Sequence, residues 1–262
     1  FSSIAVYEQS FVSLMLDFNH RLGQNASLVG GMSVYGQRLK PRIFETAALS
    51  GQNRGSRLRA GIMVYSLDQH HFARSGHDLQ FNLSYFFGQS PSFQTMPEEA
   101  NISPEELGIR VREFTQLTFN WSKYHPVKER SSFFTRVQAA YNFNYTQGFL
   151  NVFNIGGIYP SLRDQVRFSG LNEYEITTPS VMALALGWNY NFWSQFYVAP
   201  LLNVALYDFS LEKLTDVSER NLVMGAGMHL GFLSPAGPLK AGFGYSPQSG
   251  SFVGTINLGW AL

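Results

Sequence analysis

Apolar and polar residues alternate with a period of two along most of the chain. Because successive side chains of a β-strand point to opposite faces, this period predicts strands with one apolar and one polar face. The first run is Val12, Leu14, Leu16 and Phe18 against Ser13, Asp17 and Asn19. The alternation returns at 58–64, 79–87, 111–121, 182–190, 196–206, 222–232, 239–245 and 256–262. We therefore predict about eleven strands of roughly ten to fifteen residues each, a length suited to crossing a bilayer at a tilt.

The chemistry of the second face decides between two all-β architectures. A soluble β-sandwich keeps its apolar face inside and exposes a charged face, whereas a transmembrane barrel turns its apolar face to lipid. Here the second face carries mainly Gly, Asn, Ser, Thr and Gln with a few Arg, as a hydrated lumen would. Aromatic residues also fall near strand ends, where interfacial belts occur: Trp121, Tyr124, Trp188, Tyr190 and Trp193. The pattern favours a transmembrane antiparallel β-barrel.

The connections between strands are predicted to alternate between short inner turns and long outer loops, as in outer-membrane barrels. The predicted inner turns are 23–26, 68–76, 124–130, the residues near Asn191, and 233–237. The predicted outer loops are 37–55, 88–107, a connection between 130 and 151, 157–178, 208–219 and 246–250. The longest outer loop therefore lies in the second half of the chain.

Composition narrows the function classes. Charged residues make up 14% of the chain and aromatic residues 15%, so much of the surface is expected to face something other than water. The net charge of +1 gives no electrostatic case for a nucleic-acid partner. With no cysteine there is no disulfide and no thiolate site, and we predict no cofactor and no metal. No apolar run approaches the ~18 residues that a membrane helix needs.

Two motifs after Asn151 resemble those of the bacterial surface antigen superfamily, the sixteen-strand outer-membrane barrels of the BamA/TamA type. In that superfamily a Gly-Gly pair precedes a long external loop, and a Val-Arg-Gly-aromatic tip folds back into the lumen. Gly156 and Gly157 match the pair, and Val166 and Arg167 match the first half of the tip. Phe168 stands where the superfamily has glycine. The resemblance implies that the loop at about 157–178 folds toward the lumen.

The C-terminal segment resembles the closing hairpin of the same superfamily. Its inner turn and the end of its strand match at Pro235, Gly237, Pro238, Gly244 and Tyr245. Polar and apolar positions of the C-terminal signal for the assembly machinery are matched by Thr255, Trp260 and Leu262. The region from about 151 to 262 most resembles the barrel that follows a patatin-like phospholipase domain. A sixteen-strand family implies that earlier strands, and any periplasmic domain, lie upstream of Phe1.

Arg167 is the strongest candidate for a functional residue. A guanidinium inside the lumen can form bidentate hydrogen bonds to a carboxylate and so hold a long loop in place. The candidate carboxylates are Glu173, Glu175, Asp208 and Asp17. We expect Arg167→Ala to loosen the loop and to raise its sensitivity to proteases.

The expected role is structural and transporting, not enzymatic. A patatin-type lipase needs a Gly-x-Ser-x-Gly elbow, which this chain lacks, so a lipase domain would have to lie upstream. We interpret residues 1–262 as one barrel domain in the outer membrane of a Gram-negative bacterium, which anchors and translocates, or helps to assemble, an attached or partner protein domain. The alternative is a small-solute porin or uptake channel. Expected partners are lipid and lipopolysaccharide, the outer-membrane assembly machinery, and an attached periplasmic domain or a second copy.

Overall fold

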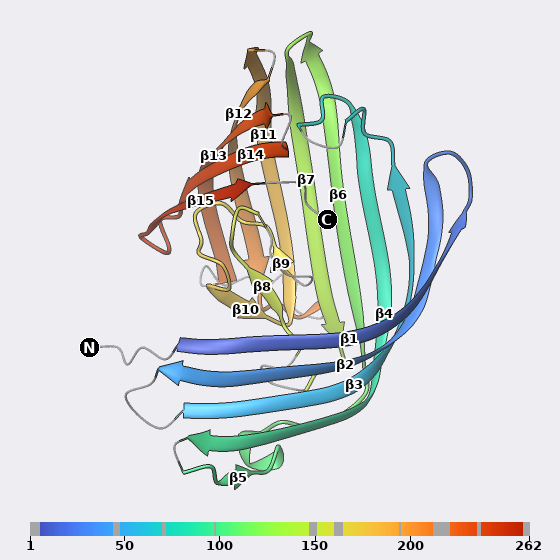
Figure 1. The fold of residues 1–262 in the computed structure, drawn as a ribbon, viewed down its shortest axis with the longest axis vertical. Coiled ribbons are helices and arrows are strands. Elements are labelled where there is room, and N and C mark those ends of the chain that lie inside the picture. The colour runs from blue at the N-terminus through green and yellow to red at the C-terminus, as the bar shows by residue number, and fades with distance from the viewer. Residues whose placement is uncertain are drawn as a thin grey trace.

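One antiparallel sheet, in which each long strand pairs with its neighbours along the chain, makes up most of the computed structural model (Figure 1). The structure describes residues 6–43, 48–69, 72–96, 98–146, 151–159, 165–193, 195–211, 221–234 and 237–258. The long strands are β1 (Val6–Arg21), β2 (Ala26–Ile43), β3 (Ala48–Tyr65), β4 (Gly76–Met96), β6 (Phe114–Lys128), β7 (Ser131–Phe143), β11 (Ser180–Trp193), β12 (Phe196–Tyr207), β13 (Leu222–Ser234), β14 (Gly237–Tyr245) and β15 (Phe252–Leu258). The prediction of an antiparallel sheet of about eleven long strands is confirmed.

Four short elements and one helical turn lie outside this meander. The edge strand β5 (Asn101–Ile102) pairs with β4, and the 3₁₀ turn η1 (Glu105–Leu107) follows it. A separate three-stranded sheet has the order β10 (Ile176–Thr178), β8 (Phe153–Ile155), β9 (Gln165–Val166). Among the described residues, no helix has the length and apolarity needed to span a membrane.

The large sheet curls around an interior without closing, because its order starts at β1 and ends at β15 (Figure 1). One end of the sheet, which we call the short-turn end, holds the connections β1–β2, β3–β4, β6–β7, β11–β12 and β13–β14. The other end holds the connections β2–β3, β4–β6, β7–β11, β12–β13 and β14–β15. The small sheet lies within the curve (Figure 1).

Three predicted connections, 37–55, 88–107 and 124–130, include residues that belong to strands, the last because β6 continues to Lys128. The residues predicted as the outer loop 37–55 are mostly strand, because β2 and β3 extend to Ile43 and from Ala48, and β4 likewise continues to Met96. These strands have 18, 18 and 21 residues, longer than predicted. Beyond the apolar stretch both faces of these strands carry polar residues, so the period of two that marks a strand is lost.

The connection between β7 and β11 is also different from the prediction. A single segment, residues 144–179, joins the two strands, and it starts 13 positions before the predicted loop at 157. The separate outer connection that was expected between 130 and 151 is therefore wrong: β7 occupies 131–143, and the long connection begins directly after it. We call residues 144–179 the long loop.

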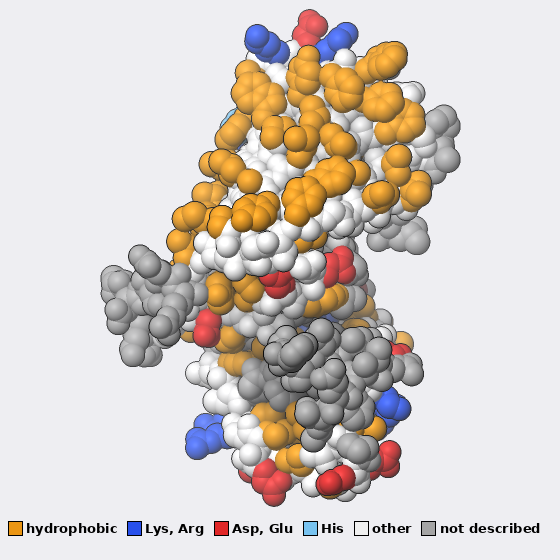
Figure 2. Space-filling model, turned by 90° about the vertical axis from the view of Figure 1, so that its left-hand side faces the viewer, with side chains coloured by type: hydrophobic (Ala, Val, Ile, Leu, Met, Phe, Trp, Pro, Cys, Tyr) orange, Lys and Arg blue, Asp and Glu red, His pale blue; other side chains and the backbone are white. Residues whose placement is uncertain are grey.

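Apolar side chains cover the outer face of the sheet, and the alternate positions face inward. On β11 the outward residues are all exposed, Met182, Leu184, Leu186, Trp188 and Tyr190, while Val181, Ala183 and Ala185 between them are buried. Leu14 and Leu16 on β1 are 79% and 80% exposed. Figure 2 shows hydrophobic side chains gathered on one such outer surface, with charged side chains toward its ends. A soluble protein does not expose a continuous apolar surface of this size.

The height of the apolar surface matches a bilayer. The outward positions from Met182 to Phe192 cover about 34 Å of strand at about 3.4 Å per residue. At a strand tilt of about 40° this run rises about 26 Å, close to the ~25 Å apolar band of outer-membrane barrels. An aromatic cluster ends the band, with the ring of Phe196 centred 5.7 Å from Phe192, 5.9 Å from Trp193 and 4.5 Å from Phe232. Aromatic rings prefer the membrane interface.

Candidate functional site

The long loop packs on the inner face of the C-terminal half of the sheet. Five of its apolar side chains form a buried cluster with small and apolar residues of the sheet. We call the inner face of the sheet the wall. The loop contributes Phe153, Ile155, Val166, Phe168 and Leu171, and the wall contributes Ala140, Val181, Ala183, Ala205 and Val223. This half of the interior is therefore a dry packed core. The sequence predicted a hydrated inner face throughout, and here that prediction is wrong.

Glycines on the wall let the loop backbone come close. A Cβ atom on Gly225 would lie 2.2 Å from the backbone oxygen of Ser169, and one on Gly227 would lie 2.6 Å from the Cβ of Ser169. On β14, a Cβ on Gly244 would lie 2.4 Å from the backbone nitrogen of Gly170. Because no real Cβ atom makes contacts this short, each of these wall positions needs a residue without a side chain.

The Gly-Gly pair turns the chain at the start of the loop. Gly156 and Gly157 have φ of 133° and 74°, values that residues with a side chain rarely adopt. The Gly157 amide donates to the Leu171 carbonyl at 3.0 Å, and the Gln165 side chain donates to the Gly156 carbonyl at 2.7 Å. These bonds tie the two arms of the loop together beside the pair.

The backbone conformation of the loop tip explains why phenylalanine can stand where the superfamily motif has glycine. Phe168 is 1% exposed, and its amide donates to the Gly157 carbonyl at 3.1 Å. Its φ is not positive, so this position does not need glycine. Gly170 supplies the left-handed residue instead, with a φ of 101°. Val166 is 5% exposed and packs in the same cluster.

Arg167 lies between two buried residues, yet its own side chain is exposed to the space inside the curved sheet. Desolvation within this enclosed space lowers the pKa of Arg167 to about 10, and the positive charge of Arg136 on β7 lowers it further. The guanidinium therefore stays charged at neutral pH. Among the residues that the structure describes, no carboxylate lies within 4.0 Å of it.

The four acids considered as partners of Arg167 have other surroundings. Glu175 accepts the amide and the side-chain nitrogen of Asn172, at 2.7 and 3.0 Å. Asp17 forms an ion pair with Arg59 at 3.0 Å, on the opposite half of the sheet. The remaining two are Glu173, whose Cγ packs beside Gly157, and Asp208, whose amide donates to Thr178 Oγ1 at 3.0 Å.

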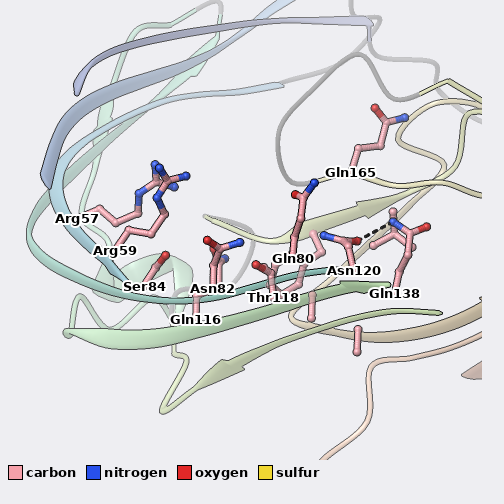
Figure 3. Close-up of a pocket in the computed structure, with 14 residues that line it drawn as sticks. Arg57, Arg59, Gln80, Asn82, Ser84, Gln116, Thr118, Asn120, Gln138 and Gln165 are labelled. Atoms are coloured by element: carbon pink, nitrogen blue, oxygen red, sulfur yellow. Dashed lines mark hydrogen bonds between the residues drawn. The ribbon is translucent and has the colours of Figure 1, made fainter. Parts of the chain in front are cut away.

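The inner face of the other half includes a polar region. A cavity of about 180 Å³ lies between the long loop and the inner faces of β3, β4, β6 and β7 (Figure 3). It is lined by Arg57, Arg59, Gln80, Asn82, Ser84, Gln116, Thr118, Asn120, Gln138, Ala139, Ala140, Phe153, Gln165 and Val166. Amide groups bond along this wall, from Gln138 to Asn120 at 3.0 Å and from Gln116 to Asn142 at 3.1 Å. Neutral amides and two guanidiniums make this a hydrated surface.

The closing hairpin joins β13 and β14. Gly237 has a φ of 123°, and its carbonyl accepts the Ser234 hydroxyl at 2.7 Å. Pro238 is paired with Leu233, and Tyr245 is 47% exposed on the outer face. Pro235 lies outside the described residues.

At the C-terminus, Thr255 on β15 is half-buried and pairs with Gly242 of β14. The other two residues of the expected assembly signal, Trp260 and Leu262, lie outside the described residues.

Residues that the sequence analysis missed hold the loop in place. Phe153, Ile155 and Leu171 are 1%, 0% and 1% exposed, and of these only Leu171 lies in the predicted outer loop 157–178. The signal that could have found them is their apolar character within a long loop, because a solvated loop has little reason to carry large aliphatic and aromatic side chains.

The solved structures that share the fold include two outer-membrane proteins. BamA from Haemophilus ducreyi, lacking POTRA domains 1–3, aligns with a TM-score of 0.60 and 15% identity, over 96% of this chain and 55% of that one. CdiB from Acinetobacter baumannii aligns with a TM-score of 0.59 and 11% identity, over 96% and 42%. The chain thus spans about half the length of these proteins or less. No protein-family profile and no curated protein matches the sequence.

Both of these proteins are outer-membrane β-barrels of the surface antigen type. The alignments extend over nearly the whole chain, which is a large antiparallel sheet with an exposed apolar outer face. The chain therefore has the fold of the outer-membrane β-barrels of the bacterial surface antigen type.

Proposed function

We propose that this chain is a large part of an outer-membrane barrel that anchors, and assembles or secretes, an attached or partner protein. The role is not enzymatic. The observation that carries the proposal is the combination of a lipid-facing apolar surface with an interior half filled by the chain's own long loop. An open diffusion pore gains nothing from a large dry cluster inside its passage, whereas a barrel that handles proteins needs a passage that stays closed at rest.

Arg167 and the loop core have different roles in this proposal. The apolar cluster around Phe168 holds the loop against the wall, because burying large apolar side chains is worth several kcal/mol in all, at about 25 cal/mol per Å². Arg167 instead adds positive charge to the enclosed interior, near Arg136 and Lys240. A protein segment with acidic groups would be attracted to this region.

A small-solute channel is the second candidate, because the amide-lined cavity of about 180 Å³ offers water a path beside the loop. The two candidate functions differ in how often small solutes pass through the barrel. A porin conducts small solutes steadily, whereas a barrel closed by its loop does so rarely.

The proposal is tested on the intact protein by two measurements. Purified protein in liposomes should give swelling in small sugars no faster than empty liposomes. Cells lacking the gene should lose at least one other protein from the outer-membrane fraction or the cell surface. Rapid swelling together with an unchanged set of surface proteins would contradict the proposal and favour the small-solute channel.

A further inference from the structure

The turn between β3 and β4 reaches across the interior at the short-turn end (Figure 1). Its arms are joined by two backbone bonds, from Ser66 to His77 at 2.9 Å and from Asp68 to Ser75 at 3.2 Å. The Asp68 carboxylate also accepts the amide of Arg74 at 2.9 Å. In the sheet, β3 and β4 pair only with β2, β5, β6 and each other. Any contact of this turn with β11–β14 therefore crosses the space that the sheet encloses.

The tip of the turn is bound to that opposite wall by hydrogen bonds. Ala73 is 3% exposed, although it belongs to a connection between strands. Its carbonyl accepts the side-chain nitrogen of Asn189 on β11 at 3.1 Å and the hydroxyl of Ser132 on β7 at 3.4 Å. Both donors are themselves buried. A buried amide without an acceptor is costly, so removing the turn would leave Asn189 unsatisfied.

The neighbouring aromatic residue fits into the same wall. The ring of Phe72 stacks on Tyr197 of β12, with centroids 4.5 Å apart and planes 9° apart. It also covers Gly231 of β13, where a Cβ atom would lie 1.9 Å from the ring. Phe72 has a φ of 53°, a conformation that a residue with a side chain adopts only when its surroundings hold it there. The wall thus provides a slot for this ring.

One cation touches both segments that fill the interior. The Lys240 ammonium on β14 lies 6.0 Å from the ring centroid of Phe72 in the turn and 5.8 Å from that of Tyr159 in the long loop. Tyr159 is held by its hydroxyl, which donates to the Ala241 carbonyl at 3.4 Å. A displacement of either ring changes the surroundings of the same ammonium group, so the two segments are coupled.

We propose that residues 72–75, in the turn between β3 and β4, form a second closure of the barrel, at the end opposite to the one where the long loop begins. The Phe72 ring closes the passage when it lies in the slot formed by Tyr197 and Gly231. Lys240 couples the turn to the long loop. The inference rests on the proposed function, because it gives the barrel a passage that has to be closed. Opening that passage requires both segments to leave the wall.

Single-channel recording on the intact protein in planar bilayers tests this closure. Phe72→Ala should raise the frequency of open-channel events about tenfold, because losing one stacked ring of about 1.5 kcal/mol corresponds to a factor of ten. Gly231→Ala should have the same effect although it leaves the sequence of the turn unchanged, since the alanine methyl group occupies the place of the Phe72 ring. Phe192→Ala is the control: this ring lies at the same end but is 49% exposed on the outer face.

A reversible crosslink separates closure from general damage to the fold. Because the chain has no cysteine, Ala73→Cys with Ser132→Cys introduces one new thiol pair. In the Phe72→Ala background, oxidation should return the open frequency to the wild-type value and reduction should restore the increase. Wild-type conductance in both Phe72→Ala and Gly231→Ala, or no effect of oxidation, would overturn the inference. Failure of the proposed function would appear separately, as rapid sugar swelling of the wild-type protein.

Discussion

Replacing Leu186 with arginine is expected to destabilise the folded protein by about 2–4 kcal/mol, the cost of a cation near the bilayer midplane on the lipid face of a barrel. Leu186 is 40% exposed and lies midway along the apolar run of β11. In a soluble protein a half-exposed leucine of this kind would accept arginine at almost no cost. The size of the effect therefore depends on the membrane and not on packing.

Equilibrium unfolding in denaturant, with the protein reconstituted in lipid vesicles, measures the loss. Val111→Arg is the matched control, because Val111 is 37% exposed in the connection before β6, beyond the apolar run. That variant should stay within about 0.5 kcal/mol of the wild type. Equal losses for the two variants would show that the outer face of β11 is not in contact with lipid.

Phe168→Ala is expected to detach the long loop. Removing a fully buried phenylalanine typically costs about 3–5 kcal/mol, and Phe168 is at the centre of the cluster between the loop and the wall. The loss should appear in hydrogen exchange at the Gly156 and Gly157 amides, whose acceptors Val166 and Leu171 lie in the other arm of the loop. Exchange there should become faster by roughly a hundredfold to several thousandfold, since each 1.4 kcal/mol is a factor of ten.

Arg167→Ala is the comparison for that variant, because the two residues are adjacent but only Phe168 is buried. From the sequence we expected loss of Arg167 to loosen the loop. With its side chain exposed and no carboxylate within 4.0 Å among the described residues, we expect a much smaller effect on exchange than for Phe168→Ala. Faster exchange in Arg167→Ala than in Phe168→Ala would mean that charge, and not apolar packing, holds the loop.

The spanning strands could be predicted from sequence because lipid imposes a simple rule on them. Leu184 and Ala185 differ in polarity and size because one meets lipid and the other meets the interior, and the pattern repeats on each strand. Beyond the apolar run this rule ends. Residues such as Gln52 and Ser92 on β3 and β4 still pair in register, but both faces are polar and carry no period. The predicted strands are therefore shorter than the observed ones.

Contacts across the interior could not be predicted, since they join positions far apart in the chain. Nothing in the sequence around Phe72 marks it as a partner of Tyr197 or Lys240. The glycines of β13, Gly225, Gly227 and Gly231, fall at strand spacing on one face of the strand. What they accommodate, the backbone of Ser169 and the ring of Phe72, is visible only in the fold.

Lipid is expected to contact one face of each long strand, and the interior of the protein the other face. Spin labels at successive positions of β11, from Leu184 to Trp188, test it directly in reconstituted vesicles. Collision rates with oxygen, which concentrates in lipid, should be high at Leu184, Leu186 and Trp188 and low at Ala185 and Gly187. Rates without this alternation, or a protein that remains monodisperse in buffer without detergent, would contradict the account.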